Sequence, residues 1–102
     1  MTIRYSPAAH EDLRTLRRYL VDEFGAAVAD RSVRKIVSDI ALLKLQPNLL
    51  RPLADKVERE THDKYFLCGR YSIAIIEHAP RVISVLRILD GRTDYCTAIF
   101  GA

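Results

Sequence analysis

The stretch GRYSIAIIEHAPRVISVLRILDGRTD, residues 69–94, decides the fold of this chain. It contains two apolar runs, Tyr71–Glu77 and Arg81–Leu89, which are separated by His78-Ala79-Pro80. Both runs are rich in Ile, Val and Tyr, the residue types that favour a pleated, half-buried strand. A connection this short predicts that the two strands pair as an antiparallel hairpin, with the three intervening residues as its turn.

Two amphipathic helices are predicted upstream of these strands. Ser6-Pro7 favours a helix start, because Ser is a good N-cap and Pro is tolerated at the first helical position. Gly25 ends this helix, and a second helix is expected over Ala27–Leu45, before Gln46-Pro47-Asn48. Each helix carries one apolar stripe at three- and four-residue spacing: Ala9, Leu13, Leu16, Leu20 and Phe24, then Ala29, Val33, Ile36, Ile40 and Leu43. The tight connection predicts an antiparallel helical hairpin.

Two further strands complete the predicted order β-α-α-β-β-β. Thr2–Tyr5 and Lys64–Cys68 have strand-like composition. In contrast, Leu49–Asp63 has no clean period and is expected to be an exposed loop, with or without a turn of helix. The first strand should join the same sheet, because an isolated strand leaves backbone groups unpaired. We therefore predict one α+β domain, residues 1–102, with an N-terminal strand, a two-helix hairpin and a three-stranded antiparallel meander. Both helices are expected on one face of the small sheet.

Composition narrows the classes of function. In 102 residues no window reaches the roughly 18 consecutive apolar residues of a membrane span. The first 20 residues carry acids and lack a continuous apolar core, so they do not look like a signal peptide. We therefore expect a cytoplasmic protein without a membrane partner. Cys68 and Cys96 fit neither a metal motif nor a disulfide framework, so reduced thiols are expected, with no metal and no cofactor. A net charge of +3 is smaller than expected for a dedicated duplex-DNA binder. It is compatible with an acidic protein partner or with modest contact to nucleic acid.

Arg70 and Arg87 are the first candidates for function, because each lies in otherwise apolar surroundings. The alternative is a structural role, since a buried arginine is usually paired. Glu77, Asp90 and Asp94 are the carboxylates expected to pair with them, and backbone carbonyls could serve as well.

Three motifs together resemble the RelE/ParE superfamily, the toxin half of type II toxin–antitoxin pairs. They are RYSPAAHEDLRTLRRYL at residues 4–20, GRYSIAI at residues 69–75 and VLRILDGRTDYCTAIF at residues 85–100. Each motif alone is loose, but their order and spacing within about one hundred residues are similar to the superfamily over nearly the whole chain. The resemblance implies the same α+β fold.

The superfamily includes two chemistries, of which one is cleavage of mRNA in the ribosome by RelE-like members. Such cleavage requires deprotonation of the 2′-OH, protonation of the leaving oxygen and stabilisation of the phosphorane charge. The candidates here are Lys64, Arg70, Arg87 and Tyr95, with His62 or His78 as a possible base. Lys56 and Lys64 are too scattered to resemble the RelE lysine cluster, and no His-Tyr pair ends the chain.

The other branch, the ParE-like members, poisons DNA gyrase and is not known to carry a nuclease site. The ending ILDGRTDYCTAIF, residues 88–100, resembles that branch through Gly91, Arg92, Asp94, Ile99 and Phe100. Asp90 departs from the pattern, because a histidine is usual there, and the departure also removes a possible general base.

The resemblance therefore favours a ParE-like gyrase inhibitor that is not an enzyme. The candidates for contact with the target are Arg70, Arg87, Arg92, Asp94, Tyr95 and Phe100. Two alternatives stay open. One is a ribosome-dependent RNase that uses Arg70, Arg87 and Tyr95 as catalytic residues, and the other is a non-toxic interaction domain of the same fold.

The resemblance also implies a cognate antitoxin, whose disordered part folds on the toxin. The helical hairpin could offer a groove for an amphipathic helix, and the residues expected to line it are Leu16, Tyr19, Leu20, Val33 and Val37. DNA gyrase is the expected target. Operator DNA is expected to be bound only through the antitoxin complex.

Overall fold

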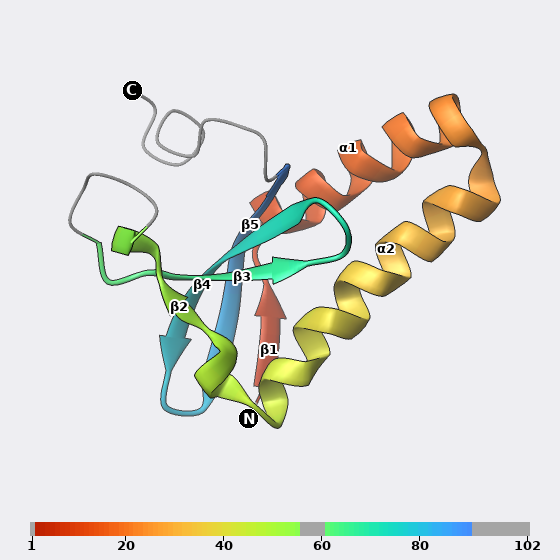
Figure 1. Ribbon diagram of the computed structural model, residues 1–102. Coiled ribbons are helices and arrows are strands. Elements are labelled where there is room, and N and C mark those ends of the chain that lie inside the picture. Colours follow the sequence, from red (N-terminus) through yellow and green to blue (C-terminus); the bar gives the residue numbers. More distant parts are fainter. Residues whose placement is uncertain (1, 56–60, 91–102) are drawn as a thin grey trace.

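The computed structural model describes residues 2–55 and 61–90, which form two helices and a five-stranded sheet. The helical hairpin lies along one side of the sheet and its far end extends beyond it (Figure 1). The principal dimensions are 38 × 33 × 22 Å. These features confirm the predicted α+β class and the placement of both helices on one face.

The helices begin and end close to the positions that the sequence predicts. Helix α1 spans Pro7–Phe24, and the hydroxyl oxygen of its N-cap Ser6 accepts a hydrogen bond from the Ala9 backbone N–H at 3.0 Å. Gly25 joins it to α2, Ala26–Ala41, with a φ of 91° that only glycine adopts readily. The second helix was predicted to reach Leu45. It ends at Ala41 and tightens into the 3₁₀ turn η1, Leu42–Lys44, which points Leu43 into the core.

The strands of the sheet lie in the order β1-β5-β4-β3-β2. Strand β1, Thr2–Tyr5, pairs in parallel with β5, Val82–Asp90, and the predicted membership of the first strand in the sheet is confirmed. Strands β3 (Lys64–Cys68), β4 (Ser72–Ala79) and β5 form the predicted antiparallel meander. The predicted turn over residues 78–80 is displaced, because β4 continues to Ala79 and its pairing with Val82 leaves only residues 80–81 as the turn.

The segment after α2 was predicted to be an exposed loop, and this was wrong for its middle part. It contains the 3₁₀ turn η2 (Pro47–Leu49), the two-residue edge strand β2 (Arg51–Pro52) and the 3₁₀ turn η3 (Leu53–Asp55). The Leu53 side chain is fully buried against the sheet. A single buried leucine between polar residues produces no period, so the sequence pattern could not indicate it.

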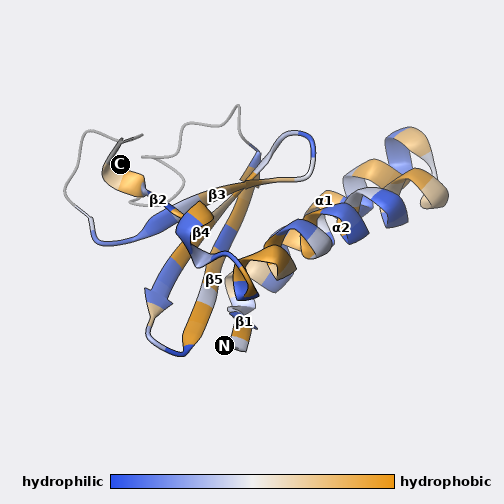
Figure 2. Ribbon diagram, turned by 60° about the horizontal axis from the view of Figure 1, so that its bottom comes forward, coloured by the Kyte–Doolittle hydropathy of each residue, from blue (hydrophilic) through white to orange (hydrophobic). Residues whose placement is uncertain are grey.

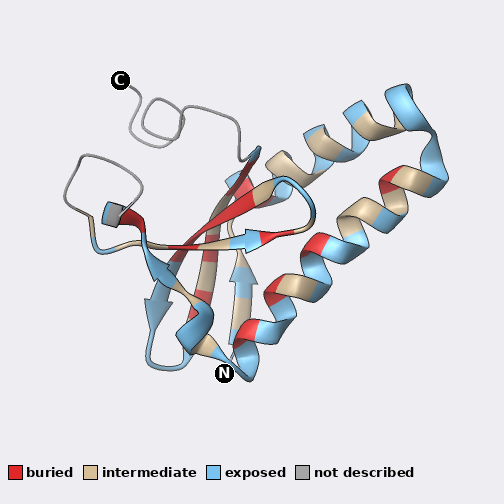
Figure 3. Cartoon of the chain, in the orientation of Figure 1, coloured by how far each residue is buried: buried red, intermediate tan, exposed pale blue. Residues whose placement is uncertain are grey.

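The sheet is apolar on both faces. On the helix side, the main cluster of buried residues is Ala9, Ile36, Ile40, Leu43, Cys68, Ala74, Ile76, Ile83, Val85 and Ile88. On the opposite side, a second cluster consists of Leu53, Tyr65, Ile73, Ile75 and Leu89, with Leu86 packed against it. Burial therefore centres on β4 and β5, whereas the far end of the helical hairpin is largely exposed (Figure 3).

The apolar stripes of the helices are buried only where the helices lie over the sheet. Ile36 and Ile40 belong to the core, but Phe24, at the far end of α1, is 60% exposed. The sequence predicted Phe24 as part of the buried stripe, and this was wrong because the sheet does not extend beneath that end of the hairpin (Figure 1). Hydrophobic positions nevertheless continue along both helices to the tip (Figure 2).

Candidate functional site

Arg87 lies at the edge of β5 where the start of α1 replaces a neighbouring strand. Strand β1 ends opposite Val85, so from Leu86 onward no strand of residues 2–55 or 61–90 pairs with β5 on that side. The Ser6 backbone N–H donates to the Val85 carbonyl oxygen at 2.9 Å, and the Ser6 hydroxyl donates to the Leu86 carbonyl oxygen at 2.7 Å. The N-terminal turn of α1 thereby satisfies backbone groups that a longer β1 would have paired.

Asp12 on α1 also binds β5, through the Arg87 side chain and a backbone N–H group. One carboxylate oxygen accepts from Arg87 Nε at 2.7 Å and from the Ile88 backbone N–H at 2.9 Å, and the other accepts from Arg87 Nη2 at 3.0 Å. The Asp12 and Arg87 side chains are 16% and 33% exposed. This bidentate arrangement is the strong geometry for an arginine–carboxylate pair. It raises the pKa of Arg87, mainly because the guanidinium donates hydrogen bonds to Asp12.

The partner of Arg87 differs from those that the sequence suggested. Glu77, Asp90 and Asp94 were the expected carboxylates, and the structure instead pairs Arg87 with Asp12, which lies 75 positions earlier in the chain. Nothing in the local pattern distinguishes Asp12 from the other acids of α1. The topology of the fold could have identified Asp12. The N-cap of α1 contacts β5, so a carboxylate about two turns further along this helix can reach the same strand.

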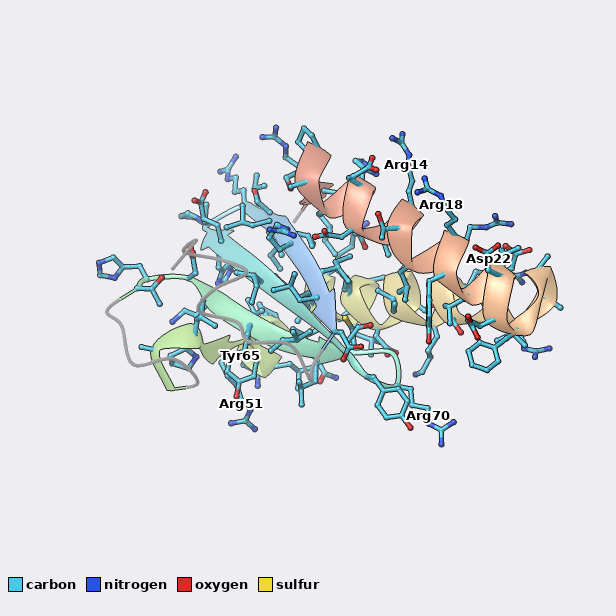
Figure 4. The ribbon with its side chains drawn as sticks, turned by 90° about the horizontal axis from the view of Figure 1, so that it is seen from above. Arg14, Arg18, Asp22, Arg51, Tyr65 and Arg70 are labelled. Carbon is cyan, nitrogen blue, oxygen red and sulfur yellow. The ribbon has the colours of Figure 1, made fainter. Side chains whose placement is uncertain are left out.

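Arg70 lies in the turn between β3 and β4. Gly69 precedes it with a φ of 62°, and the Gly69 backbone N–H donates to Asp39 Oδ2 on α2 at 2.8 Å. The Arg70 guanidinium lies 5.3 Å from the centre of the Tyr71 ring. Arg70 is exposed, and Figure 4 shows that its side chain points away from the body of the protein.

Within residues 2–55 and 61–90, the other candidates for RNA cleavage lie at several places on or beside the sheet. Lys64 begins β3, whereas Arg70 follows its end. His62 is exposed ahead of β3, and His78 is exposed near the end of β4, where it pairs with Ile83. Lys64 and Arg70 therefore lie at opposite ends of β3, so these two cationic candidates do not border one phosphate-sized site.

The C-terminal candidates Arg92, Asp94, Tyr95 and Phe100 lie outside the residues that the structure describes. Asp90, the position that departs from the expected histidine, is the exposed last residue of β5. No cluster of three or more His, Cys, Asp or Glu that could hold a metal ion occurs among the described residues. None of the described helices is long and apolar enough to cross a membrane.

The residues expected to line an antitoxin groove divide into two groups. Tyr19 and Val37 are exposed, by 57% and 41%. Leu16, Leu20 and Val33 are partly buried, and Leu16 packs against the main core. The exposed pair is therefore available to a partner, whereas Leu16 contributes to the attachment of the hairpin to the sheet.

Two shallow hollows lie outside the predicted sites. One, of about 300 Å³, is lined on α1 by Arg14, Arg17, Arg18, Val21 and Asp22. The other, of about 220 Å³, follows the edge of the sheet and is lined by Leu49, Arg51, Tyr65, Phe66 and Leu67. Figure 4 shows Arg14 and Arg18 on the α1 side of the molecule and Arg51 on the opposite side.

Comparison with known proteins defines the class. The fold matches a solved structure described as the chromosomal ParDE toxin–antitoxin system from P. aeruginosa, with a TM-score of 0.72 and 21% sequence identity. The match covers 88% of this chain and 95% of that one. A search of curated protein sequences returned no match. The chain therefore has the same fold as that solved structure, and this is the α+β fold that the sequence motifs predicted.

A family model then identifies the branch. The model described as the ParE toxin of the type II toxin–antitoxin system parDE matches residues 3–95. The chain therefore belongs to the ParE toxin family of type II toxin–antitoxin systems. This confirms the sequence-based assignment to the ParE-like branch.

Proposed function

We propose that this ParE-family chain inhibits DNA gyrase and is neutralised by a cognate antitoxin. The observation that favours inhibition over RNA cleavage is the position of Arg87. A catalytic arginine must present its guanidinium to the charge that develops on the phosphate. Here Asp12 binds the Nε–Nη2 edge of that guanidinium, which fits a structural role at the edge of β5. Membership of the ParE family supports the same choice.

The target surface in this proposal combines the exposed Arg70 at the β3–β4 turn with the C-terminal candidates. Arg70 and Tyr71 present a cation and a ring together, at a turn that Gly69 and Asp39 fasten to α2. A cation on a fixed turn loses little conformational freedom on binding, which favours affinity. Arg92, Asp94, Tyr95 and Phe100 remain candidates from sequence resemblance alone.

A supercoiling assay tests the target. Purified chain, gyrase, relaxed plasmid and ATP are incubated, and linear DNA is scored after protease treatment. We expect loss of supercoiling together with trapped, cleaved DNA, and we expect Arg70→Glu to weaken both. His78→Asp, an exposed change at the opposite end of β4, is the control that should retain inhibition. Folded protein that leaves supercoiling intact but cleaves mRNA on ribosomes would replace this proposal by the RNase alternative.

The helical hairpin is the proposed docking site for the antitoxin. Tyr19 and Val37 leave apolar surface exposed on α1 and α2, respectively, as a partner helix would require. Tyr19→Asp should weaken the complex by well over about tenfold, because a buried charge replaces an aromatic anchor. His78→Asp adds the same charge away from the hairpin and should leave the affinity unchanged. Equal affinities for the two variants, measured by titration calorimetry, would exclude this docking site.

A further inference from the structure

The β3–β4 turn is attached to one face of α2. The Gly69 backbone N–H donates to Asp39 Oδ2 at 2.8 Å, and Lys35 Nζ donates to Asp39 Oδ1 at 2.7 Å. A Cβ atom added at Gly69 would lie 2.8 Å from Ile36 Cγ1, so the turn and the helix are in close contact. These contacts place the exposed Arg70, which follows Gly69, beside the face of α2 that contains Lys35.

Two arginines extend the positive charge of Lys35 along α2. Arg31 lies four residues before Lys35 and three before Arg34, and side chains at these spacings are neighbours on a helix. All three side chains are exposed. They span about 6 Å of the helix axis, at about 1.5 Å per residue. Together with the adjoining turn they form a surface that we call the basic face: Arg31, Arg34, Lys35 and Arg70.

The charge of the basic face is largely uncompensated. In residues 2–55 and 61–90, no carboxylate forms an ion pair with Arg31, Arg34 or Arg70. The carboxylate that pairs with Lys35 is Asp39, whose side chain is only 16% exposed and also accepts from the Gly69 backbone. Four cations therefore face solvent beside one shielded carboxylate, and such a surface attracts anions.

The side chains of the basic face suit phosphates better than a protein surface. A protein interface needs an apolar core, and Val37, the large exposed apolar residue of α2, is two positions from Lys35 and so lies on another side of the helix. Ser38 is exposed three positions after Lys35 and adds a hydroxyl donor. Arginine, lysine and hydroxyl side chains are the groups that bind DNA phosphates.

The arrangement of the cations fits a duplex. Each strand of DNA presents a phosphate about every 3.4 Å of the duplex axis, so cations spread over about 6 Å of a helix can meet successive phosphates. Single strands are usually bound by rows of aromatic rings on which bases stack, whereas the basic face is built from cations. Its contacts would therefore be to the backbone of a duplex and would not depend on base sequence.

We infer that the basic face binds the phosphate backbone of duplex DNA without sequence preference. The small net charge of the whole chain, +3, implies that this binding is weak by itself. It would matter where DNA is already held nearby, as on gyrase, and this part of the inference rests on the proposed function. The basic face is separate from Tyr19 and Val37, the exposed residues of the proposed antitoxin site.

Fluorescence anisotropy of a labelled duplex, titrated with the full chain, measures the contact. Binding to about four phosphates predicts a slope of about −3.6 in log K against log salt for a duplex of about 20 base pairs. The affinity should therefore fall by about 100-fold between about 20 and about 80 mM salt. A second duplex of unrelated sequence should bind within about twofold of the first, because phosphates specify no sequence.

A double variant tests the residues of the basic face. Arg31→Ala combined with Arg34→Ala removes half of its cations, so the affinity should fall by only about tenfold over the same salt interval. At the lower salt concentration it should bind at least about tenfold more weakly than the wild type. Arg14→Ala combined with Arg18→Ala is the matched control, with the same change in net charge. Figure 4 shows Arg14 and Arg18 at the opposite edge of the view from Arg70, and this variant should keep the wild-type salt dependence.

The gyrase assay provides a second readout. At equal toxin concentration, the Arg31→Ala and Arg34→Ala double variant should trap several-fold less cleaved DNA than the α1 control. Wild type that binds duplex DNA through the basic face but leaves supercoiling intact would contradict the proposed function and support the DNA contact. Equal trapping and equal DNA binding by the two double variants would overturn the DNA contact and leave the proposed function standing.

Three further outcomes would overturn the inference. One is a wild-type salt slope shallower than about −1, which would mean that about one phosphate or none is bound. Another is tighter binding of a polyglutamate peptide than of the duplex, lost in the Arg31→Ala and Arg34→Ala variant, which would assign the basic face to an acidic protein. The third is tighter binding of a single-stranded RNA of equal length, which would assign it to RNA.

Discussion

Asp12 joins three groups of β5 to α1 with one carboxylate. It accepts two hydrogen bonds from the Arg87 guanidinium and one from the Ile88 backbone. The pair is mostly shielded from water, so its attraction is screened less than that of an ion pair on the surface. Removal of the carboxylate would leave a charged group and a backbone N–H without their acceptor.

We predict that Asp12→Ala lowers the free energy of unfolding by about 1–3 kcal/mol, the range for hydrogen bonds to a charged group, reduced for partial exposure. Asp12→Asn should cost less, because its side-chain oxygen can still accept from the Ile88 N–H. Urea unfolding at neutral pH measures both. Glu11→Ala breaks only the exposed pair with Arg14 and should change stability by less than about 0.5 kcal/mol. An equally small effect of Asp12→Ala would show that the carboxylate does not hold β5.

Cys68 and Tyr5 make the fold sensitive to alkaline pH. Burial raises the pKa of the Cys68 thiol to about 12, with a contribution from Asp39, and burial raises the pKa of Tyr5 to about 12. In the unfolded chain both groups lose their protons at lower pH, so the folded state binds more protons above pH 9. Stability is therefore complete below pH 9 and falls as the pH rises toward 12.

The measurable part of this effect up to pH 10 comes from Cys68, since its ordinary pKa is the lower of the two. Between pH 8 and pH 10 the wild type should lose about 1–2 kcal/mol of unfolding free energy from this group. Cys68→Ala is less stable throughout, but it should lose less over that interval. Parallel urea titrations at both pH values give the comparison. Identical losses in the two proteins would mean that the thiol titrates in the folded state as it does in the unfolded chain.

At the scale of elements, the two amphipathic helices and the β4–β5 hairpin could be predicted from sequence, because a period of 3.6 or a run of β-branched residues records burial directly. The ends of elements could not, as the early end of α2 shows. The burial of Leu53 and the partner of Arg87 depend on contacts between distant segments. The contact of Asp12 with Arg87 follows from the parallel pairing of β1 with β5, and the burial of Leu53 accompanies the pairing of β2 with β3. No local pattern records which acid of α1 will meet β5.

Gly69 links the β3–β4 turn to α2 and provides a prediction at this scale. A Cβ atom added at this position would lie 2.8 Å from Ile36 Cγ1, and the φ of 62° already disfavours a side chain. Gly69→Ala should therefore destabilise the fold by about 1–3 kcal/mol. Ile36→Ala removes the atom that clashes and on its own costs about 2–5 kcal/mol.

The double variant separates the clash from the backbone strain. In Gly69→Ala combined with Ile36→Ala, the new methyl group partly fills the space that the isoleucine leaves. The total loss should be smaller than the sum of the single losses by at least about 0.5 kcal/mol. Chemical unfolding of the four proteins completes the cycle. Strict additivity would show that the cost of Gly69→Ala is backbone strain alone.

At the scale of the whole molecule, the protein has a well-packed base and a projecting arm. The base contains the sheet and the adjoining parts of the helices, where Ile40, Ile76 and Val85 are fully buried. The arm is the far part of the hairpin, where Tyr19 and Phe24 are more than half exposed (Figures 1 and 3). One exposed ion pair, Arg17 with Asp30, crosses between its two helices, and such pairs contribute little. The arm should therefore open locally at a lower free energy than the base.

Amide hydrogen exchange of the isolated toxin tests this difference. We expect residues 19–30 to exchange faster than β4 and β5 by several orders of magnitude, because each 1.4 kcal/mol of opening free energy changes the rate by about tenfold. An antitoxin helix on Tyr19 and Val37 would supply the missing burial, so the complex should slow exchange across the arm more than across the base. Phe24→Ser changes an exposed side chain of the arm. In the isolated toxin it should alter the global free energy of unfolding by less than about 1 kcal/mol. Uniform protection along α1 in the isolated toxin would mean that the arm is as stable as the base, and that antitoxin binding does not order it.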